Sequence, residues 1–309
     1  MNHAARAVLC QLATGPTEVA ALTAAVGTEV PDVHRAIAQL DEAGIVTISD
    51  DHVEVHPDCQ YDERGIDRVI PEWYRLTYRD QVDSTNALAS QLGGPRPPEL
   101  GLVIAGEQTA GRGRYDREWH SPTGGIWASV IDRRPRVPTA AWHDQLAMTV
   151  AVTDLTSQVG LPTRLKWPND VVTEDGTKLA GVLVEGVASG GTVHQSVCGV
   201  GLNADIDQDR LPPEATSLRA HLSRIDPVAL IGYLLASFDR RRATPHETRA
   251  TWRRRSHTIG NEVTVTTPDG EVTGSAIELG ESGELVIEGE AGLTRIPPDR
   301  CQQLRYSSD

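Results

Sequence analysis

The stretch Lys166 to Gly181 reads K-W-P-N-D-V-V-T-E-D-G-T-K-L-A-G and holds both lysines of a chain of 309 residues. Arginine supplies the other 27 basic residues. Lysine is a compact point charge with rotatable donors, whereas arginine is a planar fork, so the two are not interchangeable at a phosphate. The two lysines therefore indicate chemistry that arginine does not perform. The alternative is that two remaining lysines lie close together by chance.

Composition bounds the class of protein. The net charge is −14, with 43 acidic residues and 4% aromatic residues, which is typical of adaptation to high salt, as in a halophile. The length predicts two or three domains. No apolar stretch approaches the roughly 20 residues that cross a bilayer, and the N-terminus lacks a signal peptide pattern, so we expect a cytoplasmic protein. The four cysteines are scattered, which favours reduced thiols.

Residues 1–60 predict a winged helix-turn-helix. An Ala-rich amphipathic segment and a second short helix precede a third helix that starts near Pro31 and ends at Gly44, and a hairpin that includes Asp50 and Asp51 follows. Such a domain inserts its third helix into the major groove, which makes His34 and Arg35 the candidate DNA-binding residues.

The charge of this segment argues against DNA. It carries nine acidic residues against Arg6 and Arg35, whereas phosphate contacts normally supply most of the binding energy. Operator binding, a protein-interaction role and a vestigial domain all stay open.

The rest of the chain divides by pattern. Residues 61–80 form a linker and core entry, and residues 81–255 mix buried strands with helices, which predicts an α+β core with a mixed sheet. Residues 256–309 show short alternating strands, which predict a small β-barrel of the SH3-like kind. The triplets Arg240–Arg242 and Arg253–Arg255 are interpreted as solvated helix faces.

Two further motifs suggest ligand binding. The loop G-E-Q-T-A-G-R-G-R-Y-D-R-E-W-H-S-P, Gly106 to Pro122, follows a predicted strand and combines close-approach glycines with three arginines, which favours an anion, although an exposed surface turn is the alternative. The segment V-D-S-T-N, Val82 to Asn86, precedes a helix. Its Ser and Thr either cap that helix or hydrogen-bond a small polar head group.

Together these stretches closely resemble the biotin–protein ligases, including the bifunctional members that also act as the biotin operon repressor. The family's G-R-G-R loop matches Gly111 to Arg114, and K-W-P-N-D matches Lys166 to Asp170. K-L-A-G matches Lys178 to Gly181, and a later G-x-G-[LI]-N matches Gly199 to Asn203. The resemblance covers nearly the whole chain and implies a ligase core between a winged helix and a small barrel.

The resemblance implies a reaction in two steps. The carboxylate of biotin attacks the α-phosphorus of ATP, giving biotinyl-5′-AMP and pyrophosphate. Because the carboxylate and the phosphates are both anionic, the site has to neutralise their charge as they approach each other. A lysine of a biotin carboxyl carrier protein of an acyl-CoA carboxylase next attacks the anhydride. Lys178 and Arg112 are the implied catalytic residues, and Mg²⁺ is the implied cofactor, with Asp170 as its ligand.

The resemblance also implies binding roles for residues around these motifs. Biotin is assigned to Ser84, Thr85, Asn86, Gln108, Arg112, Gly113, Arg114, Lys178, Gly181 and Gly199. ATP is assigned to Gly111, Arg114, Arg117, Trp119, Lys166, Asn169 and Asn203.

The sequence departs from the family at Tyr115-Asp116, where many members have basic and glycine residues, which puts closure of the loop in doubt. A homodimer is a family-level expectation, and operator DNA is a candidate partner. Two alternative functions stay open. One is a DNA-binding biotin sensor with little ligase activity, and the other is a lipoate–protein ligase.

Overall fold

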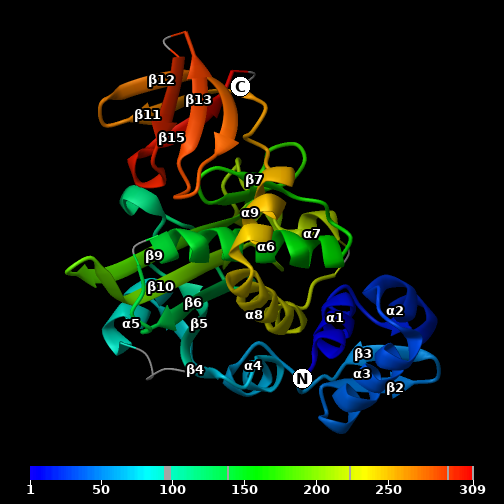
Figure 1. Cartoon of the computed structure of the whole chain (residues 1–309). Coiled ribbons are helices and arrows are strands. Elements are labelled where there is room, and N and C mark those ends of the chain that lie inside the picture. The colour runs from blue at the N-terminus through cyan, green and yellow to red at the C-terminus, as the bar shows by residue number, and fades with distance from the viewer. Residues whose placement is uncertain (94–98, 138, 223, 291, 308–309) are drawn as a thin grey trace.

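The computed structural model describes residues 1–93, 99–137, 139–222, 224–290 and 292–307. These residues form a three-stranded sheet near the N-terminus, a seven-stranded sheet in the middle and a five-stranded sheet near the C-terminus. The two smaller sheets lie on opposite sides of the middle part (Figure 1). Buried hydrophobic residues from all three parts belong to one continuous cluster, so the parts are packed together.

The N-terminal part contains three helices and three short strands. The helices are α1 (His3–Leu12), α2 (Val19–Val26) and α3 (Val30–Glu42), and the sheet order is β1 (Thr17–Glu18), β3 (His52–Val55), β2 (Val46–Ser49). The proline near the start of α3 suits the first helical turn, where no backbone N–H is needed.

Helix α1 joins the N-terminal part to the core. Most of its residues are buried, because it packs on α3 on one side and on α8 (Pro227–Ala243) on the other. The N–H of Asp226 donates to the carbonyl of Ala13 at 2.8 Å, and the rings of His3 and Tyr233 lie 6.1 Å apart. The N-terminal part is therefore fixed to the core.

The central sheet is mixed, as the sequence predicts. Its order is β4 (Tyr74–Val82), β5 (Leu100–Gln108), β6 (Ile126–Asp132), β10 (Thr192–Leu202), β9 (Lys178–Ser189), β8 (Asp170–Val172), β7 (Arg164–Lys166). Strands β4 and β5 are parallel, and the other neighbours are antiparallel.

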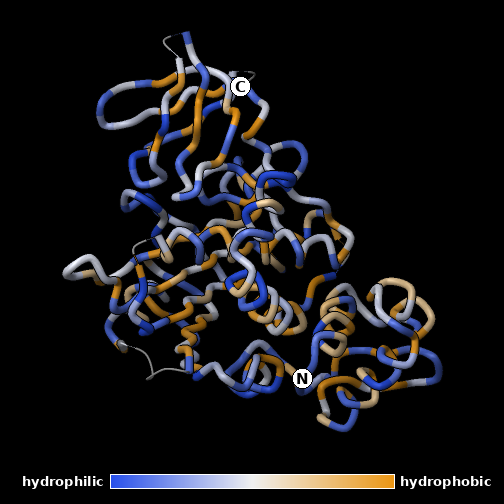
Figure 2. Tube along the Cα trace, in the orientation of Figure 1, coloured by the Kyte–Doolittle hydropathy of each residue, from blue (hydrophilic) through white to orange (hydrophobic). Residues whose placement is uncertain are grey.

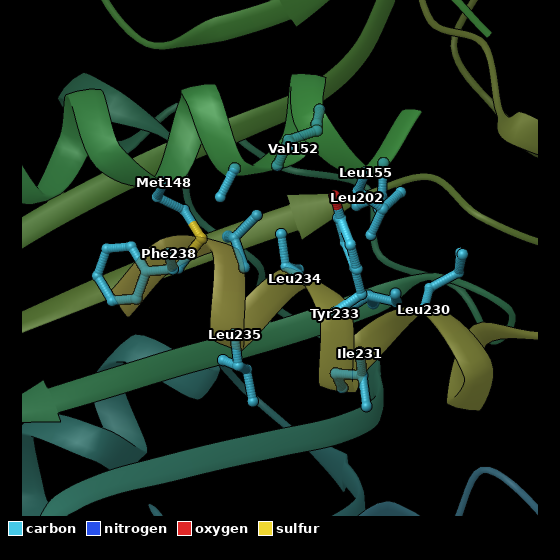
Figure 3. Packing of buried hydrophobic residues seen from close by; sticks show 14 of the residues in the cluster. Met148, Val152, Leu155, Leu202, Leu230, Ile231, Tyr233, Leu234, Leu235 and Phe238 are labelled. Carbon is cyan, nitrogen blue, oxygen red and sulfur yellow. The ribbon is translucent and has the colours of Figure 1, made fainter. Parts of the chain in front are cut away.

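Helices cover both faces of this sheet. Helix α6 (Thr139–Gln158) packs on β9 and β10 and also on α8, where Met148, Val152 and Leu155 meet α8 side chains such as Leu234 and Phe238 (Figure 3). Helix α5 (Thr85–Leu92) covers β5, β6 and β10 on the other face. Three further helices pack on the core: α4 (Glu63–Val69), α7 (Leu218–His221) and α9 (Pro245–Arg254).

Five antiparallel strands form the C-terminal part. They are ordered β14 (Gly292–Ile296), β13 (Leu285–Gly289), β12 (Gly270–Leu279), β11 (Glu262–Thr267), β15 (Gln303–Tyr306). Hydrophobic and hydrophilic residues alternate along them, which is the period-two pattern that the sequence shows (Figure 2). Trp167 fixes this part to the core, because its Nε1 donates to the carbonyl of Gly283 at 3.0 Å.

Arg240, Arg253 and Arg254 are exposed, as predicted for solvated helix faces. The prediction is wrong for the other three arginines of the triplets, which are turned toward buried carboxylates. Arg241 makes two hydrogen bonds of 2.8 Å to the buried carboxylate of Asp154, and Arg255 adds a third at 2.7 Å. Arg242 bonds Asp144 at 2.9 Å. Because α6 and α8 pack together, a polar face of α8 is turned toward buried carboxylates of α6.

No described helix combines the length and the apolar character needed to span a bilayer.

Candidate active site

A pocket of about 500 Å³ opens where the central sheet meets the C-terminal part. Its walls come from the start of α5, the loop of residues 112–119, strands β8 to β10, and residues 301–304. The residues predicted from the motifs that line it are Ser84, Thr85, Asn86, Gln108, Arg112, Gly113, Arg114, Arg117, Trp119, Lys166, Asn169, Asp170, Lys178, Gly181 and Gly199.

Four predicted residues lie outside the pocket lining. Gly111 lies just behind it, where its carbonyl accepts from the Trp119 N–H at 2.9 Å. Asn203 is buried, and its amide donates to the carbonyl of Thr216 at 2.9 Å. His34 and Arg35 lie on α3, in the N-terminal part.

A polar network forms one end of the pocket. The backbone N–H and the hydroxyl of Thr85 both donate to Oε1 of Gln108, at 2.7 and 3.0 Å. The hydroxyl of Ser129 lies 2.8 Å from the Thr85 hydroxyl and 2.7 Å from Oδ1 of Asn86. Since a hydroxyl has one proton, it satisfies only one of these two oxygens at a time. The network therefore keeps capacity for a polar ligand.

Glycines let a tryptophan lie flat against the sheet. A Cβ added at Gly201 would lie 2.4 Å from Nε1 of Trp119, and one at Gly181 would lie 3.0 Å from the same ring. A Cβ at Gly199 would lie 2.1 Å from Oδ1 of Asn86. These strand positions need glycine because the pocket residues approach the backbone too closely for a side chain.

Lys178 projects into this pocket from the first residue of β9. Its Nζ lies 2.8 Å from Oδ1 of Asp170 and 4.8 Å from the centre of the Trp119 ring. Its backbone is held on both sides, since its N–H donates to Glu214 and its carbonyl accepts from Thr216. The ammonium is thus aimed at the pocket by a carboxylate and an aromatic face.

The second lysine is held by the C-terminal part. Nζ of Lys166 lies 5.0 Å from the centre of the Tyr306 ring on β15. Asn169 has a structural contact, because its side-chain amide donates to the carbonyl of Val182 at 2.8 Å. Both lysines of the chain therefore lie on aromatic rings at one pocket.

The arginine loop reaches across to the C-terminal part. The guanidinium of Arg114 donates to the carbonyl of Cys301 at 3.1 Å and to that of Pro298, and the Tyr115 hydroxyl donates to the carbonyl of Asp299. Tyr115 and Asp116 both have φ of 55°, a left-handed conformation that is unfavourable for residues other than glycine. The loop that the sequence put in doubt is thus folded against the C-terminal part.

Comparison with known proteins identifies the family. Residues 78–203 match the model of the biotin/lipoate A/B protein ligase family, and residues 258–298 match the biotin protein ligase C-terminal domain. A bifunctional ligase/repressor of Bacillus spizizenii is 33% identical over 72% of this chain and 71% of its own length. A biotin–[acetyl-CoA-carboxylase] ligase of Mycobacterium tuberculosis is 36% identical over 74% of this chain and 90% of its own. The chain belongs to the biotin protein ligase family.

A solved structure agrees with this assignment. The biotin protein ligase of Aquifex aeolicus, solved in complex with biotin and ATP, superposes with a TM-score of 0.64 at 26% identity. It covers 75% of this ligase and 99% of its own chain. The ligase core and the C-terminal domain are therefore shared, as the motifs imply.

Sequence reasoning missed Ser129, Ser121 and the C-terminal residues of the ligase pocket. Ser129 is a polar residue in the middle of the otherwise apolar run of strand β6, which was a usable signal. Ser121 accepts from Nε2 of Gln108 at 2.8 Å. Residues 301–304 carried no signal, because they reach the pocket only through the packing of the C-terminal part.

The pocket thiol is not a nucleophile. Burial raises the pKa of Cys301 to about 11, despite the opposing charge of Arg114. The thiol is therefore protonated at neutral pH, and the thiolate is the reactive form. Covalent catalysis by this ligase through Cys301 is not supported.

Proposed function

We propose that this ligase joins biotin to ATP in the pocket around Lys178 and then transfers it to a lysine of a biotin carboxyl carrier protein. The observation that carries the proposal is the convergence of Lys178, Lys166 and the arginine loop on one pocket that also has an uncharged polar end. The polar head group of an acid such as biotin suits the uncharged end, and the carboxylate and the phosphates of a nucleotide suit the cationic end.

The uncharged end fits the ring system of biotin. Ser84, Thr85, Asn86 and Gln108 supply hydroxyl and amide groups there, and Gly181 and Gly199 leave room for an apolar ring. A urea group needs both donors and acceptors, and this network offers both. These residues bind and orient biotin, so that its carboxylate points toward the cationic end.

The cationic end suits the carboxylate and the phosphates. Lys178 and Arg112 neutralise the charge that builds when the carboxylate attacks the α-phosphorus, and Gly113 lets that loop approach. Arg114, Arg117, Lys166, Asn169 and Trp119 line the nucleotide side. Gly111 and Asn203 act from behind the wall, where Gly111 holds Trp119 and Asn203 holds the segment that contacts Lys178.

Magnesium fits this site only as an ion held mainly by ATP. The described residues contain no group of three His, Cys, Asp or Glu side chains suited to a metal. Asp170 is a single carboxylate that pairs with Lys178, and Mg²⁺ commonly binds through one carboxylate together with substrate phosphates and waters. We assign Asp170 as that ligand. The ion would supply charge neutralisation at the phosphates.

The test is biotin-dependent ATP–pyrophosphate exchange by the wild type and Lys178→Ala. We expect a loss of roughly 10²–10³-fold in the variant, since a preorganised charge at the reacting groups is removed. Lys178→Arg is the matched control, because it keeps the charge but changes its geometry. Near-normal exchange by Lys178→Ala would contradict the assignment. Exchange with lipoate in place of biotin would favour a lipoate ligase.

We also propose a division into residues 1–60, 61–80, 81–255 and 256–309. The first is a winged helix-turn-helix, which the order of three helices and three strands supports, and the last is an SH3-like barrel, which five antiparallel strands support. A homodimer formed through the core is part of the same proposal, because β4 is an edge strand of the central sheet.

Repression of an operator is the second candidate function. It is favoured by the exposed start of α3, which presents His34 and Arg35, and by relatives that are named bifunctional ligase/repressor. The charge opposes it, since Arg35 pairs with Asp32 at 2.8 Å and Arg6 is buried. Titration of duplex DNA at several salt concentrations, with biotin and ATP present, tests it. Binding that weakens steeply with salt would support a repressor, and no binding at any salt would exclude one.

A further inference from the structure

The second half of the proposed reaction creates a problem for the enzyme itself. An acceptor nitrogen bonds to the carbonyl carbon of biotinyl-5′-adenylate, the carbon–oxygen bond to the phosphate breaks, AMP leaves with the electron pair, and the nitrogen loses one proton to water. Any lysine near the pocket is therefore a competing acceptor. The following inference rests on this proposed function.

The chain has only two side-chain amines, and both line the pocket, each held against a partner in the pocket wall. Nζ of Lys178 lies between the Asp170 carboxylate, at 2.8 Å, and the ring of Trp119, at 4.8 Å. Nζ of Lys166 lies over the ring of Tyr306, at 5.0 Å. Attack on a carbonyl carbon requires a nitrogen with a free lone pair, and an ammonium group that pairs with a carboxylate or lies over a ring has none.

The exposed cations at the pocket mouth are arginines. Arg112 is 62% exposed and lies 3.8 Å from Asp116, and Arg117 is exposed and also lines the pocket. A guanidinium is charged at every physiological pH and delocalised over three nitrogens, so it does not act as an acyl acceptor. Arginine thus provides the positive charge that the phosphates need without providing an amine.

We propose that this chain is a poor acceptor of its own activated biotin, and that the rim arginines Arg112 and Arg117 determine this specificity. They hold positive charge at the mouth where a lysine would intercept the anhydride. The carrier lysine is then the amine that reaches the biotinyl carbonyl. The low reactivity of the chain toward its own activated biotin does not depend on why lysine is scarce elsewhere in the sequence.

The experiment introduces one amine at a time. Wild type, Arg117→Lys and Arg64→Lys are incubated with biotin, ATP and Mg²⁺ without carrier, and amide-linked biotin is located by peptide mass spectrometry. Arg64 is the matched control, because it is exposed on α4, which packs on α8 away from the C-terminal part (Figure 1). A parallel arm supplies synthetic biotinyl-5′-adenylate in place of biotin and ATP.

We expect no biotin on Lys166 or Lys178 of the wild type. Position 117 of Arg117→Lys should carry at least roughly tenfold more biotin than position 64 of Arg64→Lys, since an amine held at the site has a high effective concentration. Equal labelling of the two variants would overturn the proposal. So would wild-type lysines labelled as heavily as position 117, or no labelling at position 117 by the synthetic adenylate.

The two arms separate this inference from the proposed function. If the enzyme does not form the adenylate, labelling fails with biotin and ATP, and ATP–pyrophosphate exchange fails as well. The synthetic adenylate still reports whether position 117 is favoured over position 64. A loss of adenylate formation caused by Arg117→Lys itself is bypassed in the same way.

Discussion

The charged side chains on the two faces of the central sheet differ in how many partners they have within the protein. On the face under α6 and α8, the buried carboxylates of Asp132, Asp144 and Asp154 each accept hydrogen bonds from at least two arginines. On the pocket face, Lys178 and Arg112 each have one ion-pair partner and stand beside open space. Saturated charges hold the fold, and charges with free capacity are available to a ligand.

The largest effect is expected from a substitution on the face under α6 and α8, where every buried carboxylate has arginine partners. Asp154→Ala removes the buried carboxylate that pairs with Arg241 and Arg255, which leaves two partly buried cations without compensation. We expect a loss of about 3–5 kcal/mol in the free energy of unfolding, measured by denaturant titration. The KM for biotin of the folded variant should not change. Asp175→Ala is the control, since that carboxylate bonds only within its own turn.

Acid should weaken the same face. Burial alone raises the pKa of Asp154, but hydrogen bonds from Arg241 and Arg255 outweigh it and hold that pKa below its usual range. A depressed folded pKa gives stability above the unfolded pKa of about 3.9, and this stability is lost as the pH falls below that value. Denaturation midpoints at pH 7, 5, 4 and 3 should therefore fall mainly in the last two steps. Asp154→Asn should flatten that fall, and an equally steep fall in the variant would contradict the assignment.

A smaller effect is expected on the pocket face. Gly201→Ala places a Cβ 2.4 Å from Nε1 of Trp119 and displaces the ring. We expect a loss of about 1–3 kcal/mol in transition-state stabilisation, or roughly ten- to hundredfold in kcat/KM for ATP, with little change in stability. Gly186→Ala, where the added Cβ meets its first neighbour at 3.3 Å outside the pocket, is the control. Equal kinetic losses in both variants would show that the ring contact is not the cause.

The smallest effect is expected in the loop of residues 112–119, which contacts the C-terminal part. Asp116→Gly relieves a φ of 55°, a strain of about 1–2 kcal/mol that exceeds the entropic cost of glycine. We expect a gain of about 0.5 kcal/mol in the free energy of unfolding. Asp116→Ala removes the same carboxylate but keeps the strain, so it should not be stabilised. Stabilisation of both variants would mean that the charge, and not the backbone, is responsible.

Much of the site could be predicted from the sequence because its motifs are local. The G-R-G-R loop, the two lysine motifs and the glycine strand each hold their residues within a few positions of one another, and strand alternation then sets which side chains share a face. Most of the site residues predicted from these motifs line one pocket in the structure. Ser129 was overlooked, although its polarity within an apolar strand was visible.

The sequence by itself determined the family, through the resemblance of its motifs, and its local pattern determined the mixed α/β core and the pair of lysines in one motif. Only the tertiary structure decided which charges are buried and which face open space. Lys166 meets Tyr306, and Asp154 meets Arg255, across more than a hundred residues of chain. Such contacts depend on how helices and sheets dock. Sequence periodicity reports the polarity of a side chain, but the packing of another element onto it decides whether that side chain meets water or a buried partner.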